Sequence, residues 1–301
     1  MKHLKTHRLA SAFLLLVPLL LGSATGNAQD LRDTIKETFK VRPGGTLHID
    51  IDHGDVQVTS AQGNEVLVEV ERIAETNDRS DAADMFKRHS VSLEQREGDV
   101  YVKGRYDEAG STWGRWRDHS KLRVRVFVRV PDRYNVDFTS GAGNIEITNL
   151  QGNVSGSTGA GNLKLTSIRG TTELTSGSGN VVVNQATGRI EINTGAGNVD
   201  LKGIQGALEV RTGAGNVTAE IAGQPRADSH LESGAGNITV FVGHQIGMDV
   251  DASASIGSLS TDFPLKIEGS FMRKTCEGSI NGGGPALRMR TGVGNVTLRK
   301  L

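Results

Sequence analysis

Three side chains near the N-terminus have a spacing that could hold a metal ion. In the stretch LHIDIDHGD, which begins at Leu47, the residues His48, Asp50 and Asp52 alternate with apolar residues. Alternate residues of a strand point to the same face, so this imidazole and these carboxylates would share one surface. Such groups ligate divalent cations. The same pattern is typical of a strand with a solvated face, so we keep these residues as a candidate cluster and predict no bound metal or other cofactor.

A second set of carboxylates recurs at a fixed interval. Glu173, Glu191 and Glu209 are 18 residues apart, so in a coil of that length they would stack in one outward column. Two carboxylates about 5 Å apart can act as nucleophile and acid in a retaining glycosidase. Arg189 and Arg211 would flank this column, however, and the short turns provide no loops to enclose a substrate. We predict a protein that is not an enzyme, with a glycan-binding or glycan-cleaving protein that uses the stacked carboxylates as the alternative.

Both tryptophans lie in one polar segment, GSTWGRWRDHSK, at 110–121. Trp113 and Trp116 are close to Arg115 and Arg117 in this segment. Aromatic rings beside guanidinium groups are frequent in contact sites for proteins and sugars. The same rings could instead pack over the open end of the fold. These four residues are our candidate ligand-binding residues, with the role of a packed cap left open.

The repeated phrase explains where the carboxylate column comes from. TSGAGNIEIT at 139–148 returns as STGAGNLKLT at 157–166 and TSGSGNVVVN at 175–184, and a fixed period marks a repeat architecture. A phosphate-binding glycine loop would be followed by a helix, whereas strands follow here. The glycines provide corners with room for the next coil, and the asparagines can form a ladder between coils. The predicted turn residues are Gly141, Gly143, Asn144, Gly159, Gly161, Asn162, Gly177, Gly179, Asn180, Gly195, Gly197, Asn198, Gly213, Gly215 and Asn216.

Two strands in each repeat must cover each other. Pairs such as Ile145 and Ile147, or Leu163 and Leu165, alternate with polar residues and give each strand one apolar face. Coils stacked about 4.8 Å apart would pair each strand with its equivalents above and below. We predict an all-β fold, a parallel β-solenoid with two-strand coils of about 18 residues. An antiparallel meander of hairpins is the alternative.

The 301 residues divide into three predicted parts. Residues 1–28 have the basic start, apolar run and small-residue end of a signal peptide, with cleavage expected after Ala28. Residues 29–130 are predicted to form an N-terminal β region with an insertion at about 72–120, and residues 131–301 to form the repeat solenoid.

The insertion is predicted to hold a short helix around Asp81–His89 and a hairpin at 91–105, before a long strand at 121–130. Repeat arrays need non-repetitive ends that block their open sheet edges. The insertion therefore has a structural role at the start of the stack.

Charge and hydropathy limit the location and the partners. The chain has 34 Lys and Arg against 34 Asp and Glu. The leader holds three of the basic residues and no acidic one, so the mature chain would carry a net charge of −3. This balance argues against a nucleic-acid partner. The apolar run of the leader is too short to span a bilayer, so we predict no transmembrane segment in the mature chain and a location in the periplasm, in the outer envelope or outside the cell. Cys276 is the single cysteine, and we expect it to be buried and inert.

The sequence resembles the bacterial putative-adhesin domains of unknown function. The resemblance rests on the leader, the N-terminal strand region with its insertion, the stretch VRVPDRYNVDF at 128–138 and the successive glycine-bounded strands, and it covers roughly residues 40–301. It implies an envelope-associated β-solenoid and provides no catalytic residues. We therefore expect a non-catalytic, adhesin-like structural or interaction module whose partner is an unknown envelope protein or glycan.

Overall fold

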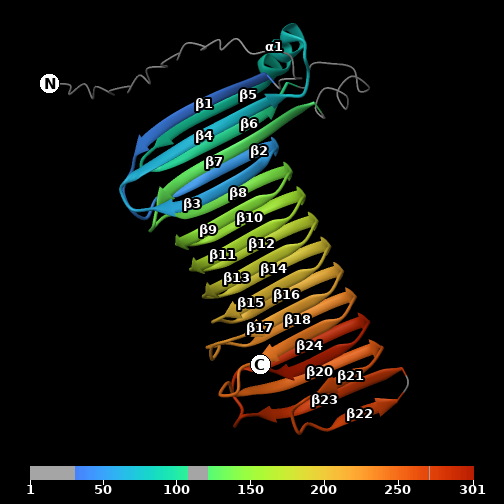
Figure 1. Cartoon of the computed structure of the whole chain (residues 1–301). Helices are drawn as coiled ribbons and strands as arrows, with labels where there is room; N and C mark the ends of the chain where they lie inside the picture. Colours follow the sequence, from blue (N-terminus) through green and yellow to red (C-terminus); the bar gives the residue numbers. More distant parts are fainter. Residues whose placement is uncertain (1–30, 108–120, 271) are drawn as a thin grey trace, which may run out of the picture.

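Each 18-residue repeat forms one coil of two strands, and successive coils stack into the elongated body of Figure 1. The computed structural model describes residues 31–107, 121–270 and 272–301. The central coils are β8 (Asn135–Ala142) with β9 (Ile145–Gln151), β10 (Val154–Ala160) with β11 (Leu163–Arg169), β12 (Thr172–Ser178) with β13 (Val181–Thr187), β14 (Ile190–Ala196) with β15 (Val199–Ile204), β16 (Leu208–Ala214) with β17 (Val217–Ile221), and β18 (Ser229–Ala235) with β19 (Ile238–Val242).

Equivalent residues of neighbouring coils pair in a parallel register. Leu163 lies between Ile145 of one neighbouring coil and Val181 of the other. The first strands of the coils belong to a 13-stranded sheet, here called sheet B, and the second strands to a 12-stranded sheet, called sheet A. Buried aliphatic side chains such as Leu165 and Ile168 form part of the core. The predicted parallel β-solenoid is confirmed, and the antiparallel meander is wrong for these coils.

A column of asparagines joins the coils at one corner. The backbone N–H of Asn162 donates to Oδ1 of Asn144 at 3.1 Å, and the same bond recurs along the stack. Asp55 begins the column and accepts from the N–H of Asn144 at 3.0 Å. Ser258 ends it, donating to Asn295 at 2.9 Å. Each coil is thus linked to the next by a side chain in addition to the strand ladder.

Glycine is required at the corners because the coils approach closely there. Gly161 has φ +125°, and a Cβ at this position would lie 2.1 Å from the carbonyl oxygen of Gly143. The residue three places before this glycine has a buried hydroxyl, which is not among the candidates taken from the sequence. This residue, Thr158, donates to the carbonyl of Ala160 at 3.1 Å. The buried hydroxyls of this column are Ser140, Thr158, Ser176, Thr194, Thr212, Ser233 and Thr291.

The N-terminal end adds two coils and three antiparallel strands. Its strands are β1 (Leu31–Lys40), β2 (Thr46–His53), β3 (Asp55–Ala61), β4 (Glu65–Ala74), β5 (His89–Arg96), β6 (Asp99–Tyr106) and β7 (Leu122–Pro131). The coil of β2 and β3 pairs with β8 and β9, and the coil of β6 and β7 lies on its other side. In sheet A, β4 and then β1 follow β7, whereas in sheet B, β5 follows β6; all three strands are antiparallel to their inner neighbour.

The insertion contains the helix and the hairpin that the sequence predicts. The helix expected at Asp81–His89 is α1 (Arg79–Arg88), and β5 and β6 form the hairpin. Arg72 of β4 holds the end of the helix, since its guanidinium donates to the carbonyls of Phe86 at 2.8 Å and His89 at 2.6 Å. Within the described residues, no helix is long and apolar enough to span a membrane.

The C-terminal end places a late coil between two earlier ones. Its strands are β20 (Met248–Ile256), β21 (Leu259–Thr261), β22 (Ile267–Ser270), β23 (Arg273–Ile280), β24 (Ala286–Val293) and β25 (Val296–Lys300). β24 lies between β18 and β20, and β25 lies between β19 and β21. β23 and β22 then close sheet B in antiparallel fashion. The last strands in sequence are therefore interior strands of the stack.

Candidate functional site

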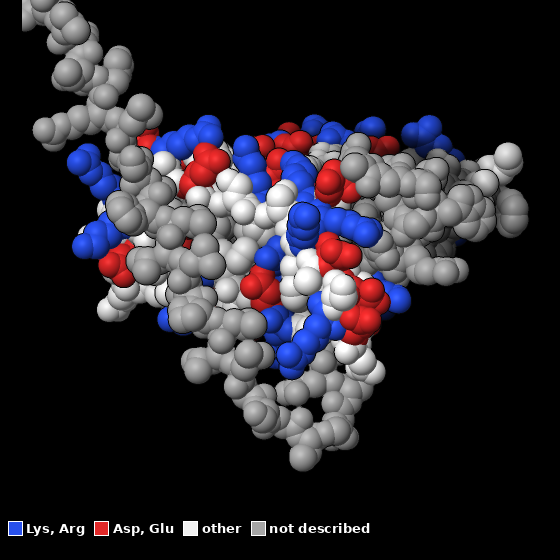
Figure 2. All heavy atoms as spheres, turned by 90° about the horizontal axis from the view of Figure 1, so that it is seen from above, with Lys and Arg blue, Asp and Glu red and all other residues white. Residues whose placement is uncertain are grey.

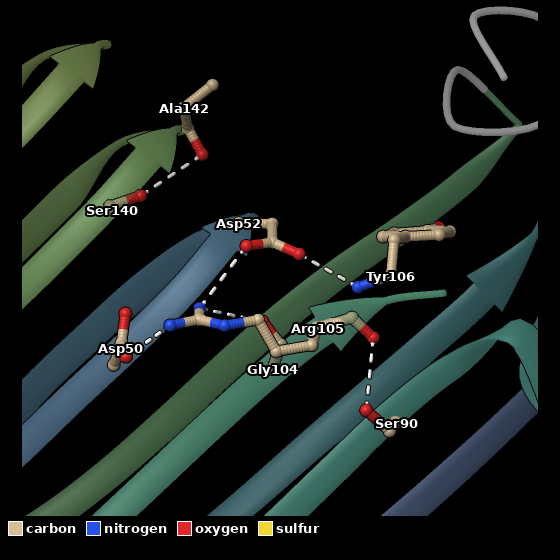
Figure 3. A network of polar contacts seen from close by, with 8 residues as sticks. All are labelled: Asp50, Asp52, Ser90, Gly104, Arg105, Tyr106, Ser140 and Ala142. Carbon is tan, nitrogen blue, oxygen red and sulfur yellow. Dashed lines mark hydrogen bonds and ion pairs between the residues drawn. The ribbon is translucent and has the colours of Figure 1, made fainter. Parts of the chain in front are cut away.

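The candidate metal face on β2 is bound by an arginine. Arg105 of β6 lies between Asp50 and Asp52, makes an ion pair with Asp50 and places Nη1 3.2 Å from Oδ1 of Asp52 (Figure 3). The second oxygen of Asp52 accepts from the backbone N–H of Tyr106 at 2.8 Å. The hydrogen bond that Arg105 donates to Asp50 raises the pKa of Arg105, so the guanidinium stays charged.

His48 turns to other partners on the same face. Its Nδ1 lies 3.1 Å from Oδ2 of Asp137, and its ring stacks on Tyr101 with 4.6 Å between centroids. Among the residues that the structure describes, no group of three or more His, Cys, Asp or Glu side chains is arranged to hold a metal ion. This face acts as an ion-pair network that ties neighbouring coils together.

The glutamate column lies where its 18-residue spacing places it. Glu191 pairs in register with Glu173 on one side and Glu209 on the other. Nη2 of Arg189 lies 3.3 Å from Glu191 and 3.8 Å from Glu209, and Arg211 lies 2.5 Å from Glu209. Two of the three carboxylates are thus held by arginines on the solvent side of sheet B.

The tryptophan segment and the single cysteine are the remaining candidates from the sequence. Trp113, Trp116, Arg115 and Arg117 lie outside the described residues. Cys276 lies in β23 with 2% of its surface exposed, and burial, helped by the nearby Glu277, raises the pKa of its thiol. A thiol protonated in this way is a poor nucleophile.

A surface with two neighbouring hollows lies on the outer face of sheet A, and its residues are not among the candidates taken from the sequence. Outward-facing Phe127 of β7 pairs with Glu69 of β4 on one side and Gln57 of β3 on the other. Arg125 and Arg129 precede and follow Phe127 by two residues, so they point to the same side of the sheet. We call these five residues the Phe127 face.

Two hollows flank the half-buried phenyl ring and share Gln57 and Phe127. One, of about 360 Å³, is lined by Asp55, Val56, Gln57, Arg125, Phe127, Asn144 and Glu146. The other, of about 260 Å³, is lined by Gln57, Thr59, Leu67, Glu69, Phe127, Val128 and Arg129. Together they form a shallow surface with an aromatic ring at its centre and one arginine in each half.

The three carboxylates that line the two hollows already have partners, and a fourth, Glu71, stands opposite Arg125 in register. Glu69 lies 2.8 Å from Nζ of Lys36 on β1, and Glu146 lies 2.8 Å from Nζ of Lys164 on the next coil. The hydrogen bond from Lys164 lowers the pKa of Glu146, so this carboxylate is ionised at neutral pH. Asp55 accepts from both the backbone and the side chain of Asn144.

The two arginines are not engaged in this way. Within the described ranges, neither Arg125 nor Arg129 has an ion pair or a side-chain hydrogen bond. Elsewhere the charges are mixed: on the visible part of the N-terminal end, Lys and Arg alternate with Asp and Glu (Figure 2). The Phe127 face therefore differs from its surroundings by two uncommitted guanidinium groups beside an aromatic ring.

Only part of this surface could be read from the sequence. The alternation of Arg123, Arg125, Phe127 and Arg129 is visible in LRVRVFVRV, and it predicts an outer face with three arginines and one aromatic ring. The partners of that face come from β3 and β4, which flank β7 although they precede it in the chain. This non-local pairing leaves no periodic signal in the sequence.

The model of the Toastrack DUF4097 family matches residues 46–299. The chain belongs to the Toastrack DUF4097 family. The Toastrack match extends from the first residue of β2 into β25 and includes the whole Phe127 face, whereas β1 lies before it.

Several solved structures are similar to this Toastrack chain at low identity. They are a putative adhesin from Bacteroides fragilis (13% identity, TM-score 0.46, covering 89% of this chain and 97% of that chain), a putative lipid binding protein from Parabacteroides distasonis (12%, 0.44, 89% and 97%) and a putative cell adhesion protein from Clostridium sporogenes (14%, 0.31, 89% and 100%). No curated protein matches the chain.

Proposed function

We propose that this Toastrack-family protein is a non-catalytic interaction module of the bacterial cell envelope that presents the Phe127 face to a partner. The observation that carries the proposal is the pair of uncommitted arginines, Arg125 and Arg129, on either side of an outward phenyl ring. Aromatic and arginine side chains contribute most of the energy in many protein interfaces, because they combine apolar area with directional donors.

The state of the acidic groups supports binding over catalysis. A general acid near neutral pH needs a raised pKa, whereas the pKa of Glu146 beside the Phe127 face is lowered. In the glutamate column, Arg189 and Arg211 neutralise Glu191 and Glu209, and each of these fixed pairs would have to break before its carboxylate could attack a sugar. These contacts disfavour the alternative of a glycan-cleaving protein.

The leader supports a location outside the cytoplasm. Cleavage after Ala28 would leave β1, which begins at Leu31, intact. β1 contributes Lys36 to the surroundings of the Phe127 face, so the mature chain keeps this face together with the lysine that pairs with Glu69. We therefore expect the exported protein to start at or near Gln29, in the periplasm, the outer envelope or the medium. Retention of Met1 on a cytoplasmic protein would contradict this location.

The binding function is tested on the mature protein with native envelope material. Immobilised protein should retain material from the envelope fraction, and Phe127→Ala should reduce that retention with little change in melting temperature. The control is Phe241→Ala, since Phe241 is also an outward aromatic residue of sheet A but lies in β19, far along the stack. If mature wild-type protein retains no envelope material, or if the two variants lose retention equally, the proposal is wrong.

A further inference from the structure

We propose that the ligand of the Phe127 face is an acidic polysaccharide, in which carboxylated sugars alternate with neutral, hydroxyl-rich stretches. This inference rests on the proposed function, because it names the chemistry of the partner at the same surface. Three properties of the face lead to it: two separated guanidinium groups, a central ring, and three surrounding carboxylates that already have partners.

The two guanidinium groups require two separate negative charges. A guanidinium binds a carboxylate through two parallel hydrogen bonds, and a free one on a surface is available for this contact. Arg125 and Arg129 are four residues apart on one extended strand, which separates their Cα atoms by about 13 Å at about 3.3 Å per residue. The ligand must therefore carry its charges at intervals and not on one group.

The ring between the arginines fits a sugar. Phe127 is half-buried, so its position is fixed by the strand while one side of the ring borders both hollows. The C–H face of a pyranose ring packs against an aromatic ring and leaves the hydroxyl groups at its rim. Those hydroxyls would meet the amide of Gln57 and the hydroxyl of Thr59, which can both donate and accept hydrogen bonds.

The carboxylates around the face select against other anionic polymers. Asp55, Glu69 and Glu146 line the hollows and remain acceptors, although each is already bound by a lysine or an amide group. Acceptors of this kind bind neutral hydroxyl groups, but they repel a continuous row of negative charges. An acidic peptide or a nucleic acid would place charge against them, whereas a polysaccharide with spaced carboxylates would not.

The experiment compares three defined polymers on the mature protein. We expect polygalacturonate that is methyl-esterified on about half of its sugars, so that charged and neutral sugars are interspersed, to bind. Its full methyl ester, which keeps the sugars and removes the remaining charges, should bind at least about tenfold more weakly, since a lost charge-assisted contact of about 1.4 kcal/mol is worth that factor. Polyglutamate has carboxylates without sugar rings, and it should also bind more weakly than polygalacturonate. Binding should weaken as salt is raised.

Substitutions then locate the binding. Arg125→Gln and Arg129→Gln should each weaken binding of polygalacturonate about tenfold and leave binding of the methyl ester unchanged. Phe127→Ala should weaken both. The matched controls are Arg299→Gln and Phe241→Ala, because both residues lie on sheet A in a register pair at the other end of the stack. Unchanged melting temperatures would exclude a loss caused by unfolding.

The outcomes separate this inference from the proposed function. Equal binding of polygalacturonate and its ester, tighter binding of polyglutamate, or equal losses in the control variants would overturn the acidic-polysaccharide ligand. If envelope material still binds in a Phe127-dependent way in that case, the interaction module stands with a different partner. If neither envelope material nor polygalacturonate binds the wild-type protein, both proposals fail.

Discussion

The middle of the stack and its two ends use the same two-strand coil in different ways. From β8 to β19, neighbours in space are neighbours in sequence and all strands are parallel. At the ends this order is broken, because β6 and β7 lie outside the earlier β2 and β3, while β24 and β25 lie between β18 and β19 on one side and β20 and β21 on the other. Antiparallel strands then complete each end.

The irregular ends explain how a repeat stack is limited in length. A regular coil exposes unpaired backbone groups that would accept another coil of the same kind, from this chain or another one. The outermost strands are poorly suited to pair with such a coil. β22 has only four residues, and β1 presents charged side chains along its edge. The charged residues of β1 are Arg32, Asp33, Lys36, Glu37 and Lys40.

The largest effect should come from removing a coil at the end compared with one in the middle. Deleting residues 286–301 removes β24 and β25 from the interior, so β18 and β20 lose their common neighbour and the end should unfold as a unit. Deleting residues 181–198 removes one repeat from the middle and joins equivalent positions. We expect a folded protein that is one coil shorter, with a loss of about 1–2 kcal/mol in unfolding free energy.

Cys276 provides the measurement for this pair of deletions. It is buried in β23 of the C-terminal end. A thiol reagent should label it rapidly after deletion of 286–301 and slowly in the wild type and after deletion of 181–198. Slow labelling after deletion of 286–301 would show that the C-terminal end stays folded without β24 and β25. Rapid labelling after deletion of 181–198 would show that loss of a central coil unfolds that end.

The next effect compares two glycines with similar backbone angles. Gly161 in the middle has φ +125° and Gly63 near the N-terminal end has φ +130°, but a Cβ at Gly63 would meet nothing within 4 Å. Gly63→Ala should lower the unfolding free energy by about 1 kcal/mol through backbone strain alone. Gly161→Ala should cost at least about twice as much, because its Cβ also meets the carbonyl of Gly143. Urea unfolding of the two variants measures the difference, and equal losses would contradict it.

A smaller effect is expected from exchanging acid and amide along the asparagine column. Asp55 at the start of the column only accepts hydrogen bonds, so Asp55→Asn should change stability by less than about 0.5 kcal/mol. Asn180 accepts from Asn198 and also donates through its amide to Asn162. Asn180→Asp should therefore cost about 1 kcal/mol at neutral pH. Chemical denaturation measures both losses. A larger loss for Asp55→Asn than for Asn180→Asp would show that the asparagine hydrogen bonds do not stabilise the stack.

The smallest effect concerns ion pairs and acid. Lys164 donates a hydrogen bond to Glu146 on the neighbouring coil and lowers the pKa of this glutamate below the ordinary 4.5. A lowered folded-state pKa gives stability that is complete above the unfolded-state pKa and is lost as pH falls through the folded-state value. Lys164→Gln should thus cost less than about 1 kcal/mol at neutral pH, and the difference from wild type should shrink below pH 4.5.

The ion pair at the N-terminal end that serves as the comparison lies on a single strand. Arg96 and Glu94 both belong to β5, and the hydrogen bond from Arg96 lowers the pKa of Glu94. The guanidinium of Arg96 also lies over the ring of Tyr101 on β6, so the variant that removes only the ion pair is Glu94→Gln. Because this ion pair does not join two strands, Glu94→Gln should leave the unfolding midpoint unchanged. A larger loss for Glu94→Gln than for Lys164→Gln would show that ion pairs do not link the coils.

The regular features of this fold were predictable from residue spacing alone. The interval between Asn144, Asn162 and Asn180 determines the coil length, and the same interval places Glu173, Glu191 and Glu209 in one column. Local repetition allows this because each coil contacts the next one in sequence.

The ends and the Phe127 face were less predictable. Between Asn237 and Asn295 the interval grows to 58 residues, and it does not reveal that β24 pairs with β18. In the same way, Arg125 and Phe127 stand out in the sequence, but the residues beside them do not. Glu69 lies next to Phe127 because β4 pairs antiparallel with β7, and Gln57 lies there because β3 pairs with β7 although three other strands separate them in the chain. Such pairing is decided by the packing of the whole chain, and its sequence signal is spread over distant segments.

The interior position of β24 and β25 also sets a time order for assembly. A growing or translocating chain can add the central coils one after another as they emerge, since each needs only the coil before it. The slot between β18 and β20 must stay empty until residues 286–300 have appeared, long after both of its walls have been made. Completion of the stack therefore waits for the final stretch of the described chain, and an interrupted product would expose an unfilled gap that proteases can recognise.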